Sequence, residues 1–170
     1  MYKDLTTFVP FTHEDSDSKN KLINFARNQD TSKVEGVMAA TLIYTNLVDY
    51  LAQHLLENLR KMIAISSYKQ FKASFYFDPS ESKNGQSLGN TIRELGCFGF
   101  ADKDDFLKLL TSFNKVRIKV IHELMKLNLN ANGSNFDTDL ANIKRMAEDI
   151  LAKYNIITSG IADAWQKIIA

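Results

Sequence analysis

Two side chains in the stretch from Asp102 to Leu127 have types that act on charged ligands: Arg117 and His122. The stretch has the periodicity of one amphipathic helix, and at about 100° per residue Arg117 falls in the middle of its apolar face. A guanidinium stays protonated at ordinary pH, so burying it requires a partner. That partner is either a carboxylate of the same chain, with Asp49 and Glu57 as candidates, or a phosphate or partner chain in a cleft or subunit interface.

The other side of the same helix is basic. Lys119, His122 and Lys126 fall within roughly 40° of Lys115 and form one polar stripe. His122 lies about 140° around the helix and roughly 7.5 Å along it from Arg117, so a straight helix cannot close both side chains on one phosphate. Two copies related by a two-fold axis could, because an isologous contact places Arg117 of one chain near His122 of the other. The apolar face consists of Phe106, Leu109, Leu110, Phe113, Val120 and Leu124.

The elements around this helix are also expected to be helices. The 170 residues suit one domain with a sizeable core, and only two prolines and seven glycines interrupt them. We therefore expect an all-α, single-domain bundle of about five helices over residues 1–170, with residues 1–14 as an N-terminal arm. His54 is expected at the edge of the core, and Trp165 is expected to be a packing anchor.

The helix boundaries come from start and stop signals. Ser32 and Glu35 have capping-box spacing, and Gly96 follows a short periodic segment. Asp102 is expected to cap the helix that carries Arg117. The expected helices are Asp15–Asn28, Val34 to about Ser66, Leu88–Leu95, Asp102–Leu127, and a last region capped by Asp137, which Thr158-Ser159-Gly160 could interrupt.

The charge balance and the cysteine content limit which ligands and compartments suit the chain. There are 21 basic and 20 acidic residues, so the chain as a whole has no general attraction for nucleic acid or anionic membrane. The lone Cys97 excludes an internal disulfide and a multi-cysteine zinc site, and it favours a reducing cytoplasm. No apolar run is long enough to span a bilayer, and the first twenty residues are too acidic for a signal peptide. The aspartates of DKDD (102–105) fit helix capping better than a metal loop, so no cofactor is expected.

The residues from Arg117 to His122 match the Arg-x4-His core of the HEPN superfamily, whose members are α-helical bundles. The surrounding FGFADKDDFLKLLTSFNKVRIKVIHEL also looks like the corresponding segment of the mannitol operon repressor group of that superfamily. The likeness is detailed over roughly Leu88 to Leu127 and is only architectural elsewhere.

The resemblance implies a specific site. Many HEPN proteins are metal-independent endoribonucleases that act as dimers, with the arginines and histidines of two chains lining one cleft. By position, Arg117 would stabilise charge on the scissile phosphate, and His122 would move protons at the 2′-hydroxyl or the leaving oxygen. Lys115, Lys119 and Lys126 would hold flanking phosphates.

The residues and the resemblance together suggest two alternative functions. The first is an RNA-cleaving HEPN homodimer of a bacterial toxin or antiphage system, held in check by an antitoxin or regulatory protein. The second is a non-catalytic module that binds a partner protein, as the mannitol-repressor-like group suggests. Ile118 favours the second, because catalytic members often have Asn or Asp after the arginine. Leu124 stands where one family variant has a tyrosine that a nucleotidyltransferase modifies.

Overall fold

The chain is all-helical, as expected. The computed structural model describes residues 13–71, 87–125 and 134–169, and these residues contain five helices and no strand. The helices are α1 (His13–Arg27), α2 (Val34–Phe71), α3 (Leu88–Leu95), α4 (Lys103–Met125) and α5 (Ser134–Ile169).

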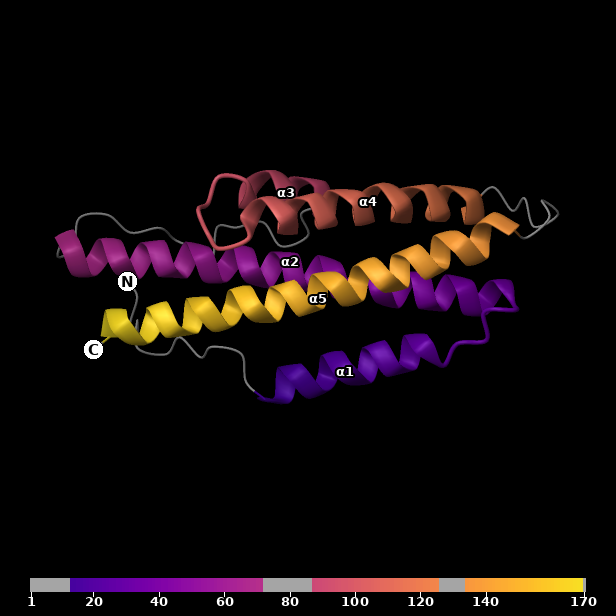
Figure 1. Cartoon of the computed structure of the whole chain (residues 1–170), viewed down its shortest axis with the longest axis horizontal. Coiled ribbons are helices and arrows are strands. Elements are labelled where there is room, and N and C mark those ends of the chain that lie inside the picture. Colours follow the sequence, from indigo (N-terminus) through magenta and orange to yellow (C-terminus); the bar gives the residue numbers. More distant parts are fainter. Residues whose placement is uncertain (1–12, 72–86, 126–133, 170) are drawn as a thin grey trace.

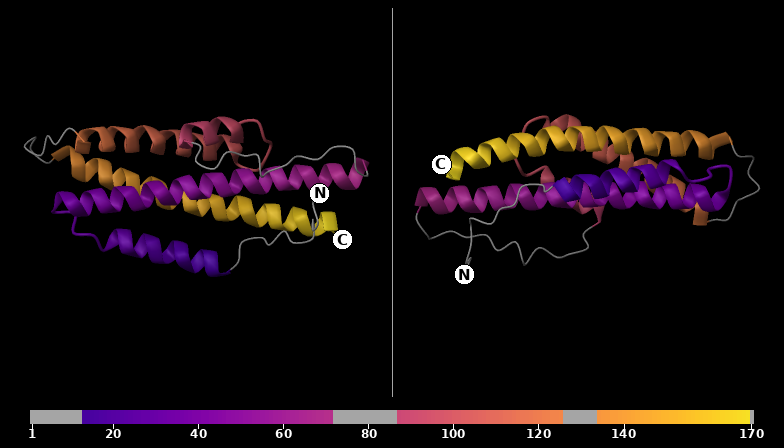
Figure 2. Two further views of the ribbon diagram at one scale, coloured as in Figure 1. Left: turned by 180° about the vertical axis from the view of Figure 1, so that it is seen from behind. Right: turned by 90° about the horizontal axis from the view of Figure 1, so that it is seen from below.

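Two long helices set the length of the bundle. With 38 residues in α2 and 36 in α5, each is more than about 50 Å long. They run in the same direction and cross each other, whereas α1 and α4 run the opposite way (Figure 1). Seen from behind, α1, α2 and α4 form one layer, and α5 lies on its far side (Figure 2). The short α3 packs on α2 and α4, and Arg60 of α2 pairs with Glu94 of α3.

The helix that carries Arg117 buries the face predicted from its periodicity. Phe106, Leu110, Phe113 and Val120 have no exposed surface, and Leu109 is partly buried against the same core. The side chain of Leu124 lies outside the described residues. The predicted roles of Trp165, 4% exposed, and of the partly buried His54 are confirmed.

The turn between α1 and α2 is unusually close-packed. A Cβ on Gly36 would lie 2.0 Å from the carbonyl oxygen of Asp30, so only glycine fits there. The carboxylate of Asp30 accepts from the hydroxyl of Ser32 at 2.6 Å and from its backbone N–H at 3.2 Å. These bonds hold the pKa of Asp30 below its ordinary value. The Ser32 side chain therefore binds Asp30 within the turn and does not form the predicted capping box with Glu35.

The corner between α3 and α4 positions the Arg117 helix. Ser87 caps α3, and Lys103 donates to the carbonyl of Gly96 at 2.5 Å. Asp102 has a φ of 55°, and its carbonyl accepts from the N–H of Phe106 at 2.9 Å. Asp102 thus precedes α4 as predicted, in a left-handed conformation that aspartate tolerates better than most residues.

One predicted interruption and three helix boundaries differ from the structure. The interruption at Thr158-Ser159-Gly160 is wrong, because α5 is continuous: the Thr158 hydroxyl donates to the carbonyl of Tyr154 at 2.9 Å. This helix begins at Ser134, three residues before Asp137, and α2 continues to Phe71. The first helix begins at His13, and residues 1–12 of the expected arm lie outside the described residues.

In the described ranges, no helix is long and apolar enough to cross a membrane. The same ranges contain no group of three or more His, Cys, Asp or Glu side chains arranged to hold a metal ion.

Candidate functional site

The guanidinium of Arg117 is bound inside its own chain. Its Nη1 donates to Oδ2 of Asp49 on α2 at 3.0 Å, and its Nε donates to Oδ1 of Asn114 at 2.9 Å. Only 14% of the Arg117 side chain is exposed. Of the two acidic candidates, Asp49 is therefore the partner. Glu57 lies eight residues further along α2, which is about 12 Å along the axis.

The carboxylate of Asp49 is only partly satisfied. Burial raises its pKa, and the charge and hydrogen bond of Arg117 lower that pKa in part. Its second oxygen, Oδ1, is buried and has no hydrogen-bond partner in the described part of the chain. Leaving a buried acceptor unpaired costs free energy. The ion pair with Arg117 therefore satisfies only one of the two carboxylate oxygens of Asp49.

Within a single chain, His122 lies away from the Arg117–Asp49 ion pair. It is exposed on α4, and the helix is continuous from Lys103 to Met125. The 140° rotation expected between the two residues is therefore kept, and their side chains point in different directions. A single chain does not form a clamp in which Arg117 and His122 hold one phosphate.

The basic stripe is partly neutralised. Lys119 binds Asp139 of α5 at 2.6 Å and lies 4.0 Å from Glu123, and its pKa is raised mainly by the hydrogen bond to Asp139. Lys115 is exposed, and no ion pair is recorded for it within the described residues. Lys126 lies outside the described residues. Lys115, Lys119 and His122 are thus all exposed, but the charge of Lys119 is already paired.

Two partners were not foreseen from the sequence. Asn114 lies three residues before Arg117, so the rule that such residues are neighbours on a helix could have indicated it. Asp139 could not be found this way, because its contact with Lys119 depends on how α4 and α5 align. That alignment is set by packing over the whole core.

Exposed apolar side chains lie on the two helices that carry the ion pair. On α2, Met38 and Leu42 lie within about 20° of Asp49 around the helix axis, and they are 43% and 52% exposed. On α4, Ile118 follows Arg117 and is 44% exposed. We call these five residues the ion-pair surface. It combines a half-buried charge pair with exposed apolar side chains.

No family model matches the chain, and none of the curated proteins or solved structures compared with it matches either.

Proposed function

We propose that this chain is a HEPN-like, non-catalytic helical module that binds a second copy of itself through the ion-pair surface and thereby presents a regulatory partner site. The observation that supports this most directly is the bond between Arg117 and Asp49. An arginine already held by two side chains of its own chain is a structural group, and replacing those bonds with a ligand would require breaking them first.

The ion-pair surface suits protein association. Interfaces commonly combine apolar and arginine side chains at a desolvated centre. Met38, Leu42 and Ile118 offer exposed apolar area on α2 and α4, the two antiparallel helices that the Arg117–Asp49 pair joins (Figure 1). In a two-fold contact this one surface would meet its own copy. We place this assembly in a reducing compartment such as the cytoplasm, where the exposed Cys97 would stay free.

The experiment compares oligomeric states by light scattering after size exclusion. The wild type should be a dimer. The double variant Leu42→Glu with Ile118→Glu should be a monomer, because the contact would then bury two glutamate carboxylates from each chain. Ile156→Glu is the matched control, because Ile156 is an exposed apolar residue of α5, at 62% exposure. A wild type that stays monomeric at high concentration, or a dimer unaffected by Leu42→Glu and Ile118→Glu, would overturn the proposal.

A metal-independent endoribonuclease is the second candidate function, as part of a toxin or antiphage system. The supporting observation is that Arg117 lies within the surface proposed to meet a second copy, so two such sites would approach each other in a dimer. His122 and Lys115 are exposed and available to RNA. Arg117 would then have to exchange Asp49 for a phosphate.

This second candidate has its own test. The purified protein is incubated with mixed RNA in EDTA, together with Arg117→Ala, His122→Ala and the control Arg145→Ala, an exposed arginine of α5. Cleavage by the wild type and the control, but by neither of the other variants, would support the ribonuclease. Intact RNA in every reaction, or cleavage that survives both substitutions, would remove it.

A further inference from the structure

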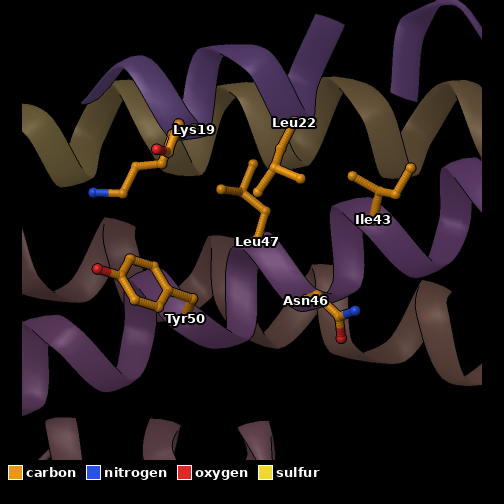
Figure 3. Close-up of a pocket in the computed structure, with 7 residues that line it drawn as sticks. Lys19, Leu22, Ile43, Asn46, Leu47 and Tyr50 are labelled. Atoms are coloured by element: carbon orange, nitrogen blue, oxygen red, sulfur yellow. The ribbon is translucent and has the colours of Figure 1, made fainter. Parts of the chain in front are cut away.

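A cavity of about 370 Å³ opens between α1 and α2. Leu22 of α1 lies opposite Ile43 and Leu47 of α2, and the three side chains form an apolar wall (Figure 3). The polar end of the cavity is occupied by the chain itself, because the Lys19 ammonium lies 5.2 Å from the ring centroid of Tyr50. The cavity therefore offers mainly apolar surface to an incoming group.

An exposed aromatic ring lies next to this cavity. Phe25 is 60% exposed, and it follows Leu22 by three residues on α1. Side chains at this spacing are neighbours on a helix surface, about 4.5 Å apart along its axis. Leu22 lines the cavity, whereas Phe25 does not. Each chain therefore carries an exposed ring and an apolar hollow side by side, and its own ring does not fill the hollow.

The cavity and the ion-pair surface are connected along α2. Leu42 of the ion-pair surface, Asn46 and Tyr50 follow one another at four-residue intervals, so they form a row on the helix surface. All three side chains are exposed, and Asn46 and Tyr50 line the cavity. One exposed row of α2 therefore runs from the ion-pair surface to the cavity.

The ion-pair surface is too small to hold a dimer by itself. A stable protein–protein contact buries about 800 Å² on each partner, from about 20–30 residues a side. The five residues of the ion-pair surface supply only part of this, so the contact must extend beyond them. Of the nine large apolar side chains that are exposed in the described ranges, three belong to the ion-pair surface and three border the cavity: Leu22, Phe25 and Tyr50. The exposed apolar surface thus continues toward the cavity.

We propose that Phe25 of each copy enters the cavity between α1 and α2 of the other copy in a two-fold dimer. This inference rests on the proposed self-association and names the side chain that each copy contributes to it. A two-fold axis in the plane of the contact, crossing α1 midway between Phe25 and Leu22, exchanges the two positions and places each ring over the hollow of the other copy. A cavity of about 150 Å³ already accepts benzene, so this larger cavity has room for the ring of Phe25.

The dissociation constant of the dimer, measured by analytical ultracentrifugation, tests the proposal. Phe25→Ala should raise this constant at least tenfold, because an aromatic anchor is lost at each of two equivalent contacts. The exposure of Phe25 means that the fold should tolerate the change. Ile156→Ala is the control, because Ile156 is 62% exposed on α5, on the far side of the layer formed by α1, α2 and α4 (Figure 2). An unchanged constant in Phe25→Ala would overturn the proposal.

A substitution inside the cavity tests the same contact from the other copy. Leu22→Trp should fill the cavity and raise the dissociation constant at least tenfold, and Leu22 is 46% exposed, so the chain should still fold. Adding Phe25→Ala to Leu22→Trp should have little further effect, because the ring then has no cavity to enter. Fully additive effects of the two substitutions would show that Phe25 does not enter the cavity.

The outcome is distinguishable from that of the proposed function. A dimer that Leu42→Glu with Ile118→Glu dissociates, and that Phe25→Ala leaves intact, would overturn the cavity contact alone. A dimer that only Phe25→Ala and Leu22→Trp weaken would support the cavity contact and remove the ion-pair surface as the interface. A monomeric wild type would overturn both.

Discussion

Arg117 and Asp49 illustrate how a charged pair is kept in a half-buried position. Each side chain alone would be costly there, and together they reduce the cost without removing it, since Oδ1 of Asp49 is unpaired in the described structure. Removing one partner should therefore be worse than removing both. This is the basis of two predictions at the scale of residues.

We expect Arg117→Met to lower the free energy of unfolding by about 1–3 kcal/mol at neutral pH, because it leaves the Asp49 carboxylate without its cation. The estimate is modest because 29% of the Asp49 side chain is exposed, so water screens part of the charge. The double variant Asp49→Leu with Arg117→Met should recover most of the loss. Urea denaturation of the wild type, Asp49→Leu, Arg117→Met and the double variant measures the coupling between the two side chains. A double variant that is less stable than either single variant would contradict this account.

The pH dependence of the same substitution has a definite sign. Burial raises the folded-state pKa of Asp49 above its unfolded value of 3.8, so stability falls as the pH rises from 3.8 through the folded-state pKa, and the full cost is present above that pKa. Arg117 offsets part of this effect only while Asp49 is ionised. The loss caused by Arg117→Met should therefore be largest at neutral pH and shrink as the pH falls through the folded-state pKa of Asp49. Denaturation curves across this range test it, and a loss that grows toward acid pH would show that Asp49 is not responsible.

At the scale of elements, the turn between α1 and α2 depends on one glycine. Gly36→Ala would place a Cβ against the backbone of Asp30, which cannot rotate away as a side chain can. We expect a loss of about 2–3 kcal/mol, since overpacking exceeds the better helix propensity of alanine.

Gly160→Ala is the control for this substitution. Gly160 lies inside α5, and nothing lies within 4 Å of the position of an added Cβ. This change should stabilise the protein by about 0.5–1 kcal/mol. Urea denaturation followed by circular dichroism compares the two, and equal effects would show that the contact with Asp30 is unimportant.

Some features of the helices could be predicted from the sequence, and others could not. Periodicity predicted the buried face of α4, and periodicity with the stop signal at Gly96 predicted α3 correctly, because both depend on neighbours within a few residues. The predicted interruption near Gly160 was wrong because packing along α5 overrides the weak helix propensity of Ser159 and Gly160. Asp49 was one of two candidates for Arg117, and only the three-dimensional alignment of α2 and α4 distinguishes it from Glu57.

At the scale of the whole molecule, α2 and α5 join all parts of the bundle into one core. We expect unfolding to be a single cooperative transition. Trp165, the only tryptophan, is buried near the end of α5 and reports on that end, whereas circular dichroism reports on all helices. The two signals should change at the same urea concentration. A fluorescence change that precedes the loss of helix would show that the end of α5 unfolds separately.

The position of α5 on one side of the layer formed by α1, α2 and α4 (Figure 2) also affects how binding should be measured on a sensor chip. A thiol introduced as Ile156→Cys, with the native Cys97 changed to serine, would attach the protein through the exposed face of α5. One defined attachment point would give every molecule on the chip the same orientation, whereas random coupling through lysines would give a mixture of orientations.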